Sequence, residues 1–323
     1  FFLLTRQWWS LMLLLLLACA SSSPAPAAEP PAPTAEVIQG GSRAEIISHG
    51  EGIANSSPSN IHPAPERLIA VGDLHGNLQD AVAVLKMAGL VDDKAAWIGG
   101  KSWLVQTGDT TDRGPDSRGV MALLRRLQTE ALAAGGKVVP LMGNHEVMNM
   151  IGDWRYVSPE DLAGYGGEGP RKQAFSVEGE DGRWLLGLGV TAKVGDSVFV
   201  HGGIDPHWAE LGIDGINNAV RTALLSPTPK TAAILGNDGP VWNRAYVLGD
   251  PPVECPRLKE ALTKLSATRM VVGHTTREDG KIESRCDGAL WVIDTGISAH
   301  YGSHHSALEI KGSEVRALYP ASP

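Results

Sequence analysis

Short apolar runs alternate with amphipathic stretches in the first half of the chain after residue 65. Apolar runs that end in polar residues and glycine predict buried strands, and apolar positions that recur three or four residues apart predict helices. The pattern predicts strands over 67–73, 103–107 and 137–142, with helices over 78–89 and 120–131 between them. This part of the chain therefore alternates strand and helix.

The second half of the chain is richer in strands. Apolar runs predict strands at 197–200, 270–272, 290–293, 307–310 and 315–318. Alternating strands and helices followed by a strand-rich end predict an α/β domain. Five of the predicted strands end in a loop that carries Asp, Asn or His beside Gly, which is where an α/β scaffold presents ligands.

These five loops have residue types that suit a pair of metal ions. Two divalent cations can polarise a phosphoryl group and lower the pKa of a bridging water, so that hydroxide forms near neutral pH. A carboxylate can bridge two ions, whereas a neutral imidazole or amide ligates one. A single Asp or His beside Gly is more often a turn residue, but five such loops together reverse that judgement. The loops are 72–76 (GDLHG), 108–114 (GDTTDRG), 143–146 (GNHE), 201–203 (HGG) and 273–275 (GHT).

In this order the loops resemble the calcineurin-like metallophosphoesterase superfamily. The Asp-Arg-Gly at 112–114 makes the resemblance closest to the phosphoprotein phosphatase branch, and it covers residues 67 to about 300. It implies two packed central β-sheets flanked by helices, and two divalent metal ions, with Mn, Fe or Zn suited to mixed N and O ligands. The implied reaction is hydrolysis of phosphate monoesters by a metal-bridging hydroxide, with a histidine as general acid.

The resemblance also assigns roles to individual residues. Arg113 is expected to clamp the phosphate, His145 to protonate the leaving oxygen, and Asp112 to orient His145. Arg244 is a candidate second clamp, with a surface salt bridge as its alternative, and Tyr301 is expected to line the pocket. The metal ligands it implies are Asp73 and His75 at the first ion, Asp109 as the bridge, and Asn144, His201 and His274 at the second ion.

An insertion at about 150–190 looks like that of the Shewanella-like protein phosphatases, as does the segment 294–298. It is expected to form a small cap over the metals, because its residues Trp154, Arg155 and Tyr156 combine apolar and phosphate-binding groups. The alternative is a stabilising loop. Phospho-Ser/Thr and phosphotyrosine both remain open as substrates. The alternatives in function are a dinucleoside-polyphosphate hydrolase and a non-catalytic binding lipoprotein.

The charge of the chain narrows the choice of partner. Lys and Arg number 28 against 36 Asp and Glu, which gives a net charge of -8 and argues against a broad grip on nucleic acid. This charge leaves open the substrates that the family resemblance implies, a phosphorylated protein or a small phosphomonoester.

The N-terminal residues have the composition of an export signal. Arg6 precedes an apolar run at 11–17 that is shorter than the roughly 20 residues of a membrane-spanning helix. Residues 1–19 are expected to be a signal peptide, and the segment 16–19 resembles a lipobox that would lipidate Cys19. Cleavage near 25–27 and an uncleaved anchor are the alternatives. All three alternatives predict an exported protein that is periplasmic or anchored at the outer membrane of a bacterium. Its only expected contact with the membrane is through this N-terminal segment.

Residues 20–65 are rich in Ser, Pro and Ala and predict a flexible linker, followed by one catalytic domain over 66–323. His62, near the end of that linker, is expected to be solvated. Cys255 and Cys286 are the cysteines of the catalytic domain. They could pair in an oxidising compartment or remain free thiols, because sequence does not give the distance between them.

Overall fold

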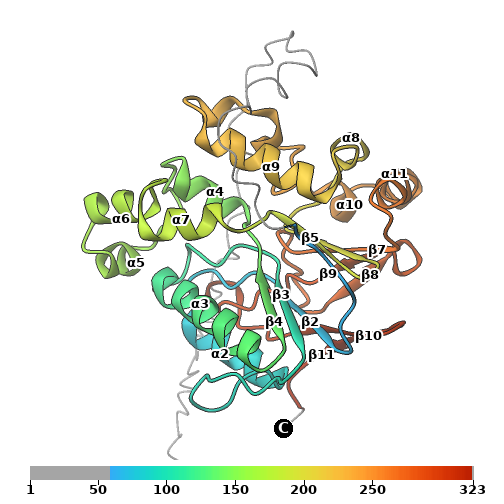
Figure 1. Cartoon of the computed structure of the whole chain (residues 1–323), viewed down its shortest axis with the longest axis horizontal. Coiled ribbons are helices and arrows are strands. Elements are labelled where there is room, and N and C mark those ends of the chain that lie inside the picture. The colour runs from blue at the N-terminus through green and yellow to red at the C-terminus, as the bar shows by residue number, and fades with distance from the viewer. Residues whose placement is uncertain (1–58, 322–323) are drawn as a thin grey trace, which may run out of the picture.

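Two β-sheets lie face to face at the centre of the protein, and helices cover their outer faces (Figure 1). The computed structural model describes residues 59–321. The expected signal peptide, including Cys19, lies outside these residues, as does most of the expected linker. Within 59–321, no helix is long and apolar enough to cross a membrane. The predicted α/β fold with two packed sheets is confirmed.

One sheet has five strands in the order β11-β10-β2-β3-β4. Strands β2, β3 and β4 run parallel, and β10 is antiparallel to both β2 and β11. Helices α2 and α3 cover the outer face with apolar side chains such as Leu85 and Leu124. The bounds are β2 Leu68–Val71, α2 Leu78–Met87, β3 Trp103–Gln106, α3 Ser117–Ala133, β4 Lys137–Pro140, β10 Ala307–Lys311 and β11 Glu314–Leu318.

The other sheet has six strands in the order β1-β5-β6-β7-β9-β8. Strands β6, β7 and β9 run parallel, whereas β5 and β8 are antiparallel to their neighbours β6 and β9. Helices α9 and α11 pack on its outer face through residues such as Ile216 and Leu258. The bounds are β1 Ile61–His62, β5 Thr191–Val194, β6 Ser197–Val200, α8 Pro206–Ala209, α9 Gly212–Leu225, α10 Ala245–Leu248, α11 Pro251–Lys264, β7 Arg269–Val272, β8 Glu283–Arg285 and β9 Leu290–Val292.

The facing sides of the two sheets form a shared apolar core. Leu68 and Ala70 of β2 point into it, where they join a cluster that includes Phe199 of β6. Ile69 and Val71, the alternate residues of β2, point toward α2 and α3. Because both faces of this strand are covered, it reads as an unbroken apolar run in the sequence.

The segment predicted as an insertion forms helices beside α4, at one side of the molecule (Figure 1). Its buried side chains Tyr165, Phe175 and Leu185 join the core on the outer side of the six-stranded sheet. This packing supports the stabilising interpretation for most of the insertion. The bounds are α4 Asn144–Met150, α5 Pro159–Gly164, α6 Glu168–Phe175 and α7 Glu180–Leu186.

The structure changes one expectation, about the end of the linker, and decides between two alternatives for the cysteines. Ile61 and His62, which the sequence places in the linker, form β1 and pair with β5. His62 is half-buried, and its ring centroid lies 5.5 Å from that of Trp103, so it is not simply solvated. Cys255 and Cys286 form a disulfide with their Cα atoms 5.4 Å apart.

Candidate active site

The carboxyl ends of the parallel strands of both sheets meet at one place. Asp73 follows β2, Asp109 follows β3, and Asn144 follows β4 in the five-stranded sheet. His201 follows β6 and His274 follows β7 in the other sheet. Since parallel strands end at the same edge of a sheet, packing of the two sheets brings the five loops together.

Asp109 is the centre of this cluster. Its Oδ2 lies 3.2 Å from Nε2 of His201, 3.7 Å from Nε2 of His75 and 3.8 Å from Nε2 of His145. Its side chain is only 2% exposed. A carboxylate surrounded by imidazoles from three separate loops has the arrangement expected of a bridging ligand.

The other predicted ligands lie around Asp109. Asp73 Oδ2 is 3.9 Å from Nε2 of His75, and Oδ1 of Asn144 is 2.8 Å from Nε2 of His201. The rings of His201 and His274 are 4.7 Å apart. The structure therefore brings together all six residues that the sequence predicts as metal ligands.

The donor set fits a pair of divalent ions. Two groups of donor atoms, each within 4.8 Å of one another, share the buried Asp109: one contains His75 and His145, the other His201 and His274. Buried carboxylates and imidazoles at this density are costly unless a cation neutralises and ligates them. The site thus suits metal ions that accept mixed N and O ligands.

The electrostatics of Asp109 follow from its neighbours. Burial by itself would raise the pKa of this carboxyl, but His201, His145 and His75 together hold the pKa well below its usual range. The carboxylate is therefore ionised at neutral pH.

Glu146 holds the loop that carries Asp109, a role that the sequence analysis did not assign. Its carboxylate accepts hydrogen bonds from the backbone N–H groups of Asp109, Thr110 and Thr111 and from both threonine hydroxyls. It also accepts from the N–H of Gly143, so it ties the loop after β3 to the loop after β4. Burial raises the pKa of Glu146.

Glycines allow the loops to approach this closely. A Cβ on Gly143 would lie 2.1 Å from Oδ1 of Asp109, and one on Gly273 would lie 2.3 Å from Oδ1 of Asp73. Any larger residue at these positions would displace a predicted ligand.

His145 and Asp112 form a buried pair. Nδ1 of His145 lies 2.8 Å from Oδ2 of Asp112, and both side chains are at most 1% exposed. The orientation predicted for this dyad is present, with Nε2 of the ring turned toward Asp109.

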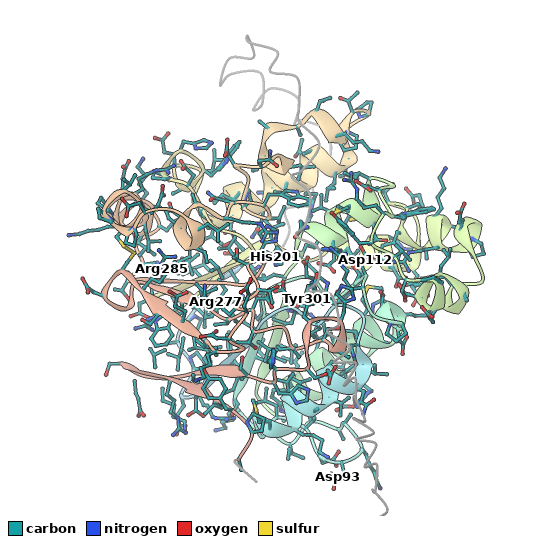
Figure 2. All side chains as sticks on the ribbon, turned by 180° about the vertical axis from the view of Figure 1, so that it is seen from behind. Asp93, Asp112, His201, Arg277, Arg285 and Tyr301 are labelled. Atoms are coloured by element: carbon teal, nitrogen blue, oxygen red, sulfur yellow. A yellow bond between two sulfur atoms is a disulfide. The ribbon has the colours of Figure 1, made fainter. Side chains whose placement is uncertain are left out.

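Four further side chains border the site. The guanidinium of Arg113 lies 3.8 Å from the ring centroid of Tyr156, a residue of the insertion that stands 5.1 Å from the ring of His145. Tyr301 lies 5.0 Å from the ring of His75. Arg244 donates from Nη1 to the carbonyl of His274 at 2.6 Å. In Figure 2, His201, Tyr301 and Asp112 lie near the middle of the molecule, whereas Asp93 lies at its periphery.

Comparison with known proteins identifies the family. A family model described as calcineurin-like phosphoesterase matches residues 66–278. The chain belongs to the calcineurin-like phosphoesterases.

Within this family, the phosphoesterase is similar to a particular group of protein phosphatases. It is 33% identical to Shewanella-like protein phosphatase 2 of Arabidopsis thaliana, over 72% of each chain. It is 31% identical to Shewanella-like protein phosphatase 1 of Plasmodium berghei, over 78% of this chain and 74% of that one. The crystal structure of a cold-active protein-tyrosine phosphatase from a Shewanella species superposes with a TM-score of 0.72 at 26% identity, covering 81% and 80% of the two chains.

The protein is therefore a hydrolase of phosphoester bonds, and its resemblance to the Shewanella-like protein phosphatases is confirmed. These matches do not favour a dinucleoside-polyphosphate hydrolase.

The phosphoesterase site also contains residues that the sequence analysis missed. Asp294 follows β9 at the same edge of the sheet and accepts from the hydroxyl of Thr276 at 2.6 Å, and burial raises its pKa. Asn149 and Arg171 contact Asp112 from the side away from His145. Asp294 follows a strand like the predicted ligands and could have been found by that signal. Arg171 has no such signal, because it lies in a polar helix of the insertion.

Proposed function

We propose that this phosphoesterase is a protein phosphatase that hydrolyses phosphotyrosine. The observation that carries the proposal is a pair of tyrosine rings flanking two site histidines. The rings of His75 and His145 are 4.8 Å apart, with Tyr301 beyond His75 and Tyr156 beyond His145. Aromatic walls on both sides suit an aryl phosphate, because ring pairs in contact add to the free energy of binding. The names of the relatives point to phosphoprotein substrates as well.

In this proposal each side chain has one task. Two divalent ions, of Mn, Fe or Zn, would polarise the phosphoryl group and make a water nucleophilic near neutral pH. Asp73, His75, Asp109, Asn144, His201 and His274 would hold them. Arg113 and Arg244 bind the phosphate oxygens through their planar guanidinium groups. His145, oriented by Asp112, carries the proton that the leaving oxygen takes up.

The experiment is phosphate release by the full chain after metal removal and titration with Mn, Zn or Mg. The substrates are p-nitrophenyl phosphate and peptides that carry phosphotyrosine, phosphoserine or phosphothreonine. We expect metal-restored turnover, with the phosphotyrosine peptide cleaved fastest. Preference for phosphoserine would reject the tyrosine assignment, and no turnover of any monoester with any metal would reject the phosphatase proposal.

We also propose that the domain works outside the cytoplasm, attached or secreted through its N-terminal segment. The apolar run at 11–17 and the pairing of Cys255 with Cys286 support this location, because disulfides persist in oxidising compartments. Fractionation of cells that produce the full chain would find it outside the cytoplasm, and recovery only in the cytosolic fraction would contradict the proposal.

A further inference from the structure

A buried arginine from the insertion lies directly behind the His145–Asp112 dyad. Arg171 of α6 is fully buried, with its Nη2 3.1 Å from Oδ1 of Asp112. Its Nη1 lies 2.6 Å from Oδ2 of Asp161 in α5. The fork of one guanidinium thus joins two buried carboxylates.

The two oxygens of Asp112 face different partners. Oδ2 faces Nδ1 of His145 at 2.8 Å, while Oδ1 accepts from Nη2 of Arg171 and from Nδ2 of Asn149 at 2.8 Å. Asn149 is itself fixed, because its Oδ1 accepts from Nη2 of Arg171 at 2.9 Å. These contacts leave the Asp112 carboxylate one orientation, in which Oδ2 meets the histidine.

The same network holds the backbone of Asp112. Both oxygens of Asp161 accept from Ser117, one from its N–H at 2.8 Å and the other from its hydroxyl at 2.7 Å. The Ser117 hydroxyl in turn accepts from the N–H of Asp112 at 3.0 Å. Asp112 has a φ of 67°, in the left-handed region that a non-glycine residue enters only when its surroundings hold it there.

We infer that Arg171 is a positioning residue for the general acid: by clamping Asp112 from behind, it holds His145 in line with the leaving oxygen of the substrate. The inference rests on the proposed function and gives the insertion a task in the reaction as well as in packing. The alternative is a purely structural ion pair, which would stabilise the fold without touching the chemistry.

The dependence of rate on the leaving group separates these roles. Protonation of the leaving oxygen matters more for a basic leaving group, so loss of the general acid slows phenyl phosphate more than p-nitrophenyl phosphate. We expect Arg171→Met to lower kcat for phenyl phosphate by about 100-fold, in the range that general acids contribute. The loss with p-nitrophenyl phosphate should be several times smaller. The ratio of the phenyl phosphate rate to the p-nitrophenyl phosphate rate therefore falls.

Arg125→Met is the matched control. Arg125 pairs with Asp181, another buried aspartate of the insertion, at 2.5 Å and stacks on Trp184, but these contacts do not include Asp112 or His145. This variant should lose stability while the ratio of the two rates stays at the wild-type value.

Arg171→Lys keeps a buried positive charge but lacks the fork that contacts Asp112 and Asp161 together. Its unfolding temperature should recover toward the wild-type value while the ratio stays low. If Arg171→Met does not fold, this variant carries the test. A wild-type ratio in the folded variant overturns the inference. A wild-type chain that cleaves neither ester would instead reject the proposed function.

Discussion

At the residue scale, backbone conformations that most residues avoid are concentrated in the site. Ten non-glycine residues within 59–321 have a positive φ, and five of them are predicted site residues. Each such residue costs roughly 1 to 3 kcal/mol and persists only where its surroundings hold it. Glu146 holds the N–H groups around Asp109, as described above. The five are His75, Asp109, Asp112, Arg113 and His274.

Asp109→Asn removes the shared charge at the centre of the cluster. We expect metal-dependent turnover to fall by more than about 100-fold, because loss of a ligand should cost at least as much as loss of a residue that supports one. The fold should persist, since the change removes no apolar contact. Turnover after metal titration and the unfolding temperature measure the two effects.

Asp93→Asn is the control for this variant, because Asp93 is exposed and pairs with Lys86 far from the site. It should keep wild-type activity. Unchanged activity in Asp109→Asn would reject the assignment of the metal site.

At the element scale, β10 joins the C-terminal hairpin to the first strand of the domain. Glu309 of β10 is only 3% exposed at its side chain and lies 2.6 Å from both Arg67, before β2, and Arg316 of β11. Burial alone would raise the pKa of Glu309, but hydrogen bonds from Arg67 and Arg316 outweigh burial and lower it. The carboxylate therefore stabilises three adjacent strands only while it is ionised.

Glu309→Gln should remove this stabilisation, and the size of the loss should depend on pH. Because the folded-state pKa is lowered, the stabilisation is fully present above the unfolded value of about 4.3 and is lost as pH falls through the folded value. We expect Glu309→Gln to lower the free energy of unfolding by about 1 kcal/mol at pH 7, a modest figure because Arg316 is half exposed. The difference from wild type should shrink as the pH falls below the unfolded value, as measured by urea unfolding.

The exposed Glu314 on the neighbouring strand β11 offers the control. Glu314→Gln should show a much smaller difference at pH 7. A Glu309→Gln difference that does not change between pH 7 and pH 3 would contradict the ion-pair argument.

At the scale of the whole molecule, the layers are joined covalently as well as by packing. Cys255 lies in α11, and Cys286 lies just before β9, so their disulfide ties an outer helix to the six-stranded sheet. The two cysteines are separated by 31 residues along the chain. Neither contributes to the site, which lies at the strand ends.

Replacing both cysteines by alanine should lower the free energy of unfolding by about 3 kcal/mol, since the closed loop no longer restricts the unfolded chain. Activity at low temperature should stay near the wild-type level. Denaturant unfolding with and without reductant measures the effect: reductant should destabilise the wild type and leave the double variant unchanged. A wild type indifferent to reductant would show that the bridge contributes nothing.

The sequence by itself determined the features that are local along the chain. Apolar periods located the strands β2, β3, β4, β6 and β7 and the helices α2 and α3, because burial of a strand or a helix face leaves a period of its own. The candidate metal ligands were also predictable, from the five strand-end loops together with the family resemblance that assigned their roles. Its ligands follow strand ends directly, and parallel strands of one sheet bring such ends to one edge.

Only the tertiary structure decided which distant residues support the side chains of the site. Arg171 lies 59 residues from Asp112 in the chain, and Glu146 lies 37 residues from Asp109, yet each pair is in contact. The partner of Cys255, the pairing of Ile61 with β5 and the approach of Tyr156 to His145 likewise depend on the path of the chain. A period in the sequence reports which face of an element is buried, but not what covers that face, so contacts between distant elements appear only when the sheets and the insertion pack.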